Sequence, residues 1–138
     1  MPKPSTDLVR GIPLFRDLDD KSIQRLADEF IERSFATGDV IAAEGQGGLN
    51  FFVVESGEAT VSVHGNEVGR LTAGDSFGEI ALIDKSARTA TVTAATDMHC
   101  YGLPVWSFRP LVEQNPDLAW RLLETLAARL REAQERVH

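Results

Sequence analysis

The sequence predicts a mainly β domain of the double-stranded β-helix class, a jelly-roll-like β-roll with N-terminal helices and two C-terminal helices. Helical periodicity is confined to the two ends of the chain, and the stretch between them consists of brief apolar or alternating runs separated by glycines. With 138 residues, 43% of them hydrophobic and 25% charged, the chain has the size and composition of one globular domain. We expect a single domain over 1–138, divided into a helical segment 1–30, a β-roll 31–104 and two helices within 105–138.

The N-terminal segment carries a short amphipathic helix behind Asp19, which is a favourable cap residue. Apolar residues follow at positions i, i+3, i+4 and i+7: Ile23, Leu26, Ala27 and Phe30. Residues 8–18 are expected to form a shorter helical or turn segment.

The clearest strand is residues 59–63, where alanine and valines alternate with Thr60 and Ser62. It follows the apolar run 51–54, and the tight turn 64–66 leads on to a strand over 67–71, so we expect a meander of hairpins. Two further strands are expected at 90–94 and 98–103, the second ended by Pro104.

Helical periodicity returns after Pro104. A short helix is predicted over 105–114, and Asn115, Pro116 and Asp117 supply the start of a second one. Leucines continue at four-residue spacing along that helix: Leu118, Leu122, Leu126 and Leu130. We expect this stripe, together with Trp106 and Trp120, to pack in the core or at an interface.

Charge and hydropathy restrict the partners. A formal net charge of -7 argues against nucleic-acid binding, which needs a clustered basic surface. No apolar run reaches the length of a membrane span, and the N-terminus lacks the apolar stretch of a secretion signal, so we expect a cytoplasmic protein without membrane contact. The single Cys100 agrees with a reducing compartment.

Neither a metal site nor an enzyme active site is predicted. His64, His99 and His138 share no ligand spacing, which argues against a metal-binding cupin of similar fold. Nothing in the sequence resembles an activated nucleophile or a general base with an orienting partner. A binding module is therefore favoured over an enzyme, with no cofactor beyond its ligand.

The segment 74–94 carries the chemistry of an anion site. Gly78 lets the backbone approach a ligand, and Arg88 comes nine positions after Glu79, just ahead of a predicted strand. A carboxylate at this spacing suits sugar hydroxyls, and a guanidinium suits a phosphate.

This segment resembles the phosphate-binding cassette of the cyclic nucleotide-binding domain family, which includes the catabolite activator protein, the regulatory subunits of cAMP-dependent kinase, cGMP-dependent kinases and cyclic-nucleotide-gated channels. The match consists of Phe77-Gly-Glu-Ile-Ala-Leu82 and Arg88-Thr-Ala-Thr-Val92. The resemblance extends from about Leu14 onward and includes Asn115-Pro116.

The resemblance implies that Glu79 accepts a hydrogen bond from the ribose 2′-hydroxyl and that Arg88 pairs with an oxygen of the cyclic phosphate. The remaining contacts would come from Phe77, Gly78, Ile80, Ala81, Thr89 and Ala90. Because the family tolerates a hydroxyl at the position of Thr89 with either base, the residue does not decide between cAMP, the expected ligand, and cGMP.

The resemblance also implies that the C-terminal helices act as hinge and lid, and that the last one moves over the base when ligand binds. The expected capping residues are Leu123, Leu126, Ala127, Leu130 and Arg131. An effector protein or domain would receive the signal, and a homodimer through the last helix is a further expectation.

One departure from the family pattern is Ala87, which stands where proline usually precedes the arginine. The absence of that proline removes a local restriction on the backbone before Arg88 and bears on the affinity for the ligand. It keeps open an alternative function, a ligand-blind scaffold of the same fold that binds a partner protein.

Overall fold

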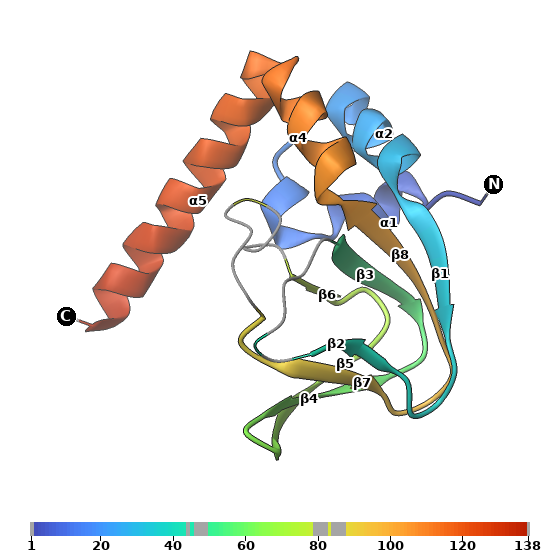
Figure 1. Cartoon of the computed structure of the whole chain (residues 1–138). Coiled ribbons are helices and arrows are strands. Elements are labelled where there is room, and N and C mark those ends of the chain that lie inside the picture. Colours follow the sequence, from blue (N-terminus) through green and yellow to red (C-terminus); the bar gives the residue numbers. More distant parts are fainter. Residues whose placement is uncertain (1, 44, 46–49, 79–82, 84–87, 138) are drawn as a thin grey trace.

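The computed structural model describes residues 2–43, 45, 50–78, 83 and 88–137 (Figure 1). Its helices are α1 (Thr6–Arg10), the 3-10 helix η1 (Pro13–Phe15), α2 (Asp20–Glu29), α4 (Val105–Glu113) and α5 (Pro116–Val137). Its strands are β1 (Ile31–Phe35), β2 (Val40–Ala42), β3 (Asn50–Ser56), β4 (Ala59–Val63), β5 (Asn66–Leu71), β6 (Ser76–Phe77), β7 (Thr91–Ala94) and β8 (Met98–Pro104). The predicted fold class, a mainly β domain with helices at both ends, is confirmed.

Helix α2 begins where the sequence predicts. The Asp19 side chain accepts a hydrogen bond of 2.8 Å from the backbone N–H of Ser22, which satisfies one of the free donors of the first turn. Hydrogen bonding from Ser22 also lowers the pKa of the Asp19 carboxyl. The apolar face of the helix, including Ile23 and Leu26, is fully buried.

The strands form two four-stranded antiparallel sheets, one in the order β1-β8-β3-β6 and the other in the order β2-β7-β4-β5. Consecutive strands β3 and β4 therefore lie in different sheets, and the predicted hairpin between these two strands is wrong. Gly57 is at the point where the chain crosses from one sheet to the other. It has a φ of 94°, and an added Cβ would lie 2.4 Å from the carbonyl oxygen of Asp97, so the crossing requires glycine.

The β4–β5 pair is a true hairpin. His64 and Gly65 both have positive φ, 52° and 82°, which is the backbone of a two-residue type I′ turn. Asn66 already pairs with Val63 in the ladder, so the turn is one residue shorter than the sequence predicts.

Strand β3 supplies both hydrophobic cores because its side chains alternate between two faces. Phe51 and Val53 pack on the outer face of their sheet against the helices, whereas Phe52 and Val54 point into the roll toward the second sheet. The larger, outer core is formed chiefly by α1, η1, α2, α4 and the first turns of α5.

Helix α5 leaves the core along its length. Leu118 and Leu122 are buried, but Leu130 is 61% exposed, and Figure 1 shows the helix starting beside α4 and ending far from the N-terminus. Trp106 and Trp120 are 59% and 66% exposed, so neither is part of the core, and packing at an interface stays a prediction. Among the described residues, no helix is both long and apolar enough to cross a bilayer.

Candidate functional site

The candidate site begins at the end of the short strand β6. Phe77 pairs with Phe52 of β3, and the two rings stack with centroids 5.2 Å apart and planes 25° apart. This stacking fixes the chain just before Gly78. The next three predicted contact residues, Glu79, Ile80 and Ala81, lie outside the described residues.

Gly78 and Arg88 are in direct contact. Gly78 has a φ of 91°, and a Cβ added to it would lie 2.1 Å from Nη1 of Arg88 and 3.0 Å from its Cζ. No larger residue fits between this backbone and the guanidinium without displacing it. Two residues ten positions apart in the sequence thus form one wall of the candidate site.

Arg88 is held by its backbone as well as by its side chain. Its carbonyl oxygen accepts a hydrogen bond of 2.8 Å from the N–H of Gly45, whose φ is 81°. The residue is half-buried, and burial lowers the pKa of its guanidinium, which still remains protonated at neutral pH because arginine titrates far above it. Thr89 is exposed and Ala90 half-buried, immediately before β7 begins at Thr91.

The turn before β6 is tied to β3 on both sides of Val54. The N–H of Val54 donates to the carbonyl of Asp75, and the N–H of Gly74 donates to the carbonyl of Val54, each at 2.8 Å. The Asp75 side chain closes the turn by accepting from the N–H of Thr72 at 2.8 Å. Strand β3 therefore sets the position from which Phe77 and Gly78 emerge.

A groove of about 360 Å³ lies between the second half of α5 and the body of the domain. Two of the predicted capping residues, Leu126 and Leu130, line it together with Leu14 and Ile83. The other three, Leu123, Ala127 and Arg131, are exposed and do not line the groove.

The structure adds three residues that sequence reasoning did not assign to the site. Gly45 supports the Arg88 backbone, and Leu14 and Ile83 face α5 across the groove. Ile83 lies inside the recognised cassette and could have been selected from it. Gly45 is one of the glycines that the family resemblance includes, although its bond to Arg88 was not predicted. Leu14 carries no local signal, because only the tertiary fold brings it to the site.

No group of three or more His, Cys, Asp or Glu side chains within the described part of the chain could hold a metal ion. His99 instead lies between two carboxylates, those of Glu32 and Glu55. The Cys100 thiol is buried, and burial raises its pKa to about 11, which keeps it protonated and unreactive at neutral pH.

Comparison with known proteins decides the family. The profile described as "Cyclic nucleotide-binding domain" matches residues 32–115, which run from the second residue of β1 through β8 and α4. This chain belongs to the cyclic nucleotide-binding domain family. The family is one of ligand-binding domains, in agreement with a binding module rather than an enzyme.

The relatives come from several kinds of regulator. A cGMP-dependent protein kinase of Eimeria tenella is 39% identical over 98 residues, covering 70% of this chain and 10% of the kinase. The N-terminal domain of a transcriptional regulator from Streptomyces coelicolor superposes with a TM-score of 0.87 at 30% identity, covering 94% of this chain and 96% of that domain. Cyclic AMP-bound PfPKA-R superposes with a TM-score of 0.70 at 29% identity, covering 94% of this chain and 46% of the other. The chain spans only 10% to 14% of the first curated relatives that it matches.

Proposed function

We propose that this chain is the cyclic-nucleotide-sensing module of a regulatory protein, with cAMP as its ligand and cGMP as the alternative. The contact between Gly78 and Arg88 carries the proposal, because the guanidinium lies directly against the backbone of a glycine. A guanidinium in this position suits a compact, singly charged cyclic phosphodiester. Both ligands occur in the names of relatives, one as cGMP-dependent and one as cAMP-bound.

In this proposal Arg88 pairs with the cyclic phosphate, and the backbone at Gly78 approaches it closely. Glu79 binds the ribose 2′-hydroxyl, while Ile80, Ala81 and Ala90 contribute backbone contacts and Thr89 a hydroxyl. The stacked rings of Phe77 and Phe52 hold the backbone that precedes Gly78.

The direct test is a thermal-shift series with cAMP, cGMP, 2′-deoxy-cAMP and AMP. A ligand at a hundred times its dissociation constant adds about 2.7 kcal/mol to the free energy of unfolding. We expect stabilisation by cAMP or cGMP and none by AMP, which carries a doubly charged, open phosphate. The 2′-deoxy analogue should bind more weakly by about 1.5–3 kcal/mol if Glu79 recognises the hydroxyl. Absence of any shift would favour the ligand-blind scaffold.

Signal output is proposed to run through α5. Its first turns are anchored in the core by Leu118 and Leu122, whereas its second half borders a groove that a small rotation could close. Ligand can shift the helix only if it binds one helix position more tightly than the other.

A matched pair of variants tests this lid. Leu126 is half-buried in the groove, and Leu123, one turn earlier, is exposed. Leu126→Ala should weaken cyclic nucleotide binding, measured by calorimetry, and Leu123→Ala should leave it unchanged. Equal affinities in the two variants would contradict capping by this face.

We further propose that α5 joins two copies of the chain. Exposed apolar side chains recur along it at heptad-like spacing: Trp120, Leu123, Ala127, Leu130 and Val137. Sedimentation analysis should report a dimer that Leu123→Asp converts to monomer, whereas Ala128→Asp, also exposed but outside this seam, preserves it. A monomeric parent protein would exclude the dimer and leave an effector domain as the partner of α5.

A further inference from the structure

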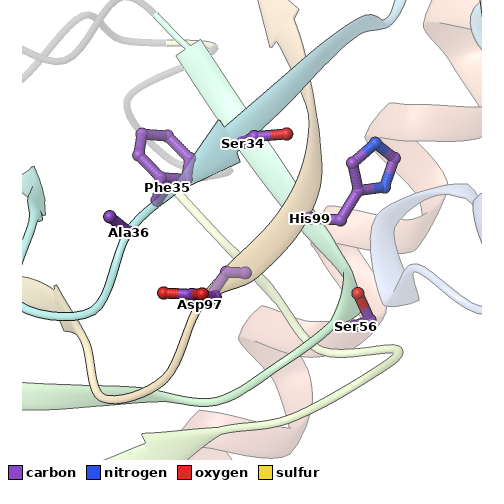
Figure 2. Close-up of a pocket in the computed structure, with 7 residues that line it drawn as sticks. Ser34, Phe35, Ala36, Ser56, Asp97 and His99 are labelled. Atoms are coloured by element: carbon purple, nitrogen blue, oxygen red, sulfur yellow. The ribbon is translucent and has the colours of Figure 1, made fainter.

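His99 connects three strands of the sheet β1-β8-β3-β6. It lies on β8, its Nε2 is 2.9 Å from Oε1 of Glu32 on β1, and its Nδ1 is 2.7 Å from Oε1 of Glu55 on β3. Figure 2 shows the imidazole pointing to the same side of the sheet as Ser34 and away from Phe35, which faces the interior of the roll. The cluster is thus on the outer side of the sheet, on the opposite face from the roll interior.

The geometry depends on the protonation state of the ring. A carboxylate can only accept hydrogen bonds, and a neutral imidazole has one N–H donor and one nitrogen lone pair. Both contacts are hydrogen bonds only in the imidazolium, which donates from both nitrogens. In the neutral ring, one lone pair faces a carboxylate oxygen.

The groups that face His99 reinforce this preference. Besides Glu32 and Glu55, the ring of Tyr101 meets the imidazole edge-on at 5.2 Å. Asp97 lines the same surface hollow, but Figure 2 shows its side chain directed away from the imidazole, and its carboxylate accepts hydrogen bonds from Thr37. No lysine or arginine is among the described residues that line the hollow. The imidazole is only a quarter exposed, so water screens these charges incompletely.

Helix α4 also packs on β8, at the end of the strand away from His99. Its charged residues Arg109 and Glu113 pair with each other at 2.7 Å. Hydrogen bonding from His99 to Glu32, with a further contribution from Glu55, raises the pKa of the ring above its ordinary value. The surroundings of the ring from β1, β3, β8 and α4 are consistent with proton binding.

The His99 cluster lies next to the part of β3 that holds the turn before β6. Glu55 is the extra residue of a β-bulge, because Val54 pairs with Cys100 and Ser56 pairs with His99. Val54, its chain neighbour, bonds through its backbone to Gly74 and Asp75. A change in how Glu55 is held therefore reaches the turn that precedes β6.

We propose that His99 is a proton-binding site which, in its charged form, ties β1, β8 and β3 together and tightens the bulge that holds the turn at residues 72–75. Because the pKa is higher in the folded than in the unfolded chain, the stabilisation is complete below the unfolded value of about 6.5 and is lost as pH rises through the folded value. The protein then senses protons independently of its nucleotide.

The test is an NMR titration of the ligand-free protein between pH 5 and pH 9, following the His99 ring and the backbone amides of Val54 and Gly74. We expect the His99 midpoint to lie above that of histidine in an unfolded peptide, and to fall in Glu32→Gln and in Glu55→Gln. The two amides should titrate with the His99 midpoint in the parent protein and lose that transition in His99→Gln. His64→Asn, a change in the β4–β5 turn, is the matched control and should preserve it.

A midpoint at or below the peptide value, or one that neither glutamine variant moves, would overturn the proton site. A normal His99 titration without any response at Val54 and Gly74 would overturn the link to the turn. Both outcomes are read without cyclic nucleotide, so they are distinct from a failure of the proposed ligand function.

Discussion

The two faces of the sheet β1-β8-β3-β6 differ in what they bury. The outer face packs large, fully enclosed rings against the helices, and Phe51 meets Phe15 edge-on at 5.9 Å. The inner face buries Phe52 beside smaller side chains such as Val54 and Cys100, and its aromatic member at the site, Phe77, is only half-buried. The comparison indicates that the outer face stabilises the domain, while the inner face supports a ligand site at the cost of complete packing.

Truncation on the two faces should have different consequences. Phe51→Ala removes a fully buried ring and should lower the free energy of unfolding by about 3–5 kcal/mol. Phe77→Ala removes a half-buried ring and should cost clearly less stability, but it should weaken cyclic nucleotide binding because the chain before Gly78 loses its stack on Phe52. Urea denaturation and calorimetry on both variants measure the two effects.

If Phe77→Ala destabilised the protein as much as Phe51→Ala and left affinity unchanged, the division between a stabilising and a ligand-supporting face would be wrong.

Two glycines on the ligand side separate backbone strain from contact with Arg88. Gly78 and Gly74 have φ values of 91° and 93°, but only at Gly78 would an added Cβ meet the guanidinium, since nothing lies within 4 Å at Gly74. Both alanine substitutions should cost about 1–2 kcal/mol of stability through strain. Only Gly78→Ala should also abolish ligand binding, measured by calorimetry. Equal affinity of the two variants would show that the contact with Arg88 does not matter to the ligand.

The smallest expected effect is at the acid end of the pH range. The Asp97 carboxylate accepts hydrogen bonds from the backbone N–H of Thr37 at 2.9 Å and from its hydroxyl at 3.0 Å, and these bonds lower its pKa. Because the folded pKa is depressed, this stabilisation is present above the unfolded value of about 3.9 and is lost as pH falls through the folded value. Asp97→Asn should flatten the acid limb of the stability curve, whereas unaltered acid sensitivity would remove Asp97 as a contributor.

Much of the fold followed from local signals. The Asp19 cap, the alternation at residues 59–63 and the proline after Asn115 each depend on near neighbours in the chain, and each element formed where predicted. The connection at Gly57 could not be predicted from local signals, because the backbone against which Gly57 packs, at Asp97, is forty residues later in the sequence.

The candidate site divides in the same way. Gly78 and Arg88 could be selected from a motif, since the family pattern fixes their spacing. The His99 cluster could not, because its carboxylates come from Glu32 and Glu55 and meet the ring only through the register of three strands. The exposure of Trp106 and Trp120 was likewise not predicted, because it depends on which parts of the fold cover each face of α4 and α5.

The most direct test of the central claim is calorimetric titration of cAMP and cGMP into the parent protein, Arg88→Ala and Arg70→Ala. Arg70 is exposed on β5, where it faces Glu67 at 4.0 Å, and serves as a charge-matched control. Loss of a phosphate partner in a partly desolvated site should cost about 2–5 kcal/mol, which is roughly thirty-fold to several thousand-fold in affinity. We predict that loss for Arg88→Ala and near-parent affinity for Arg70→Ala. Unchanged binding in Arg88→Ala would contradict the assignment of the phosphate site.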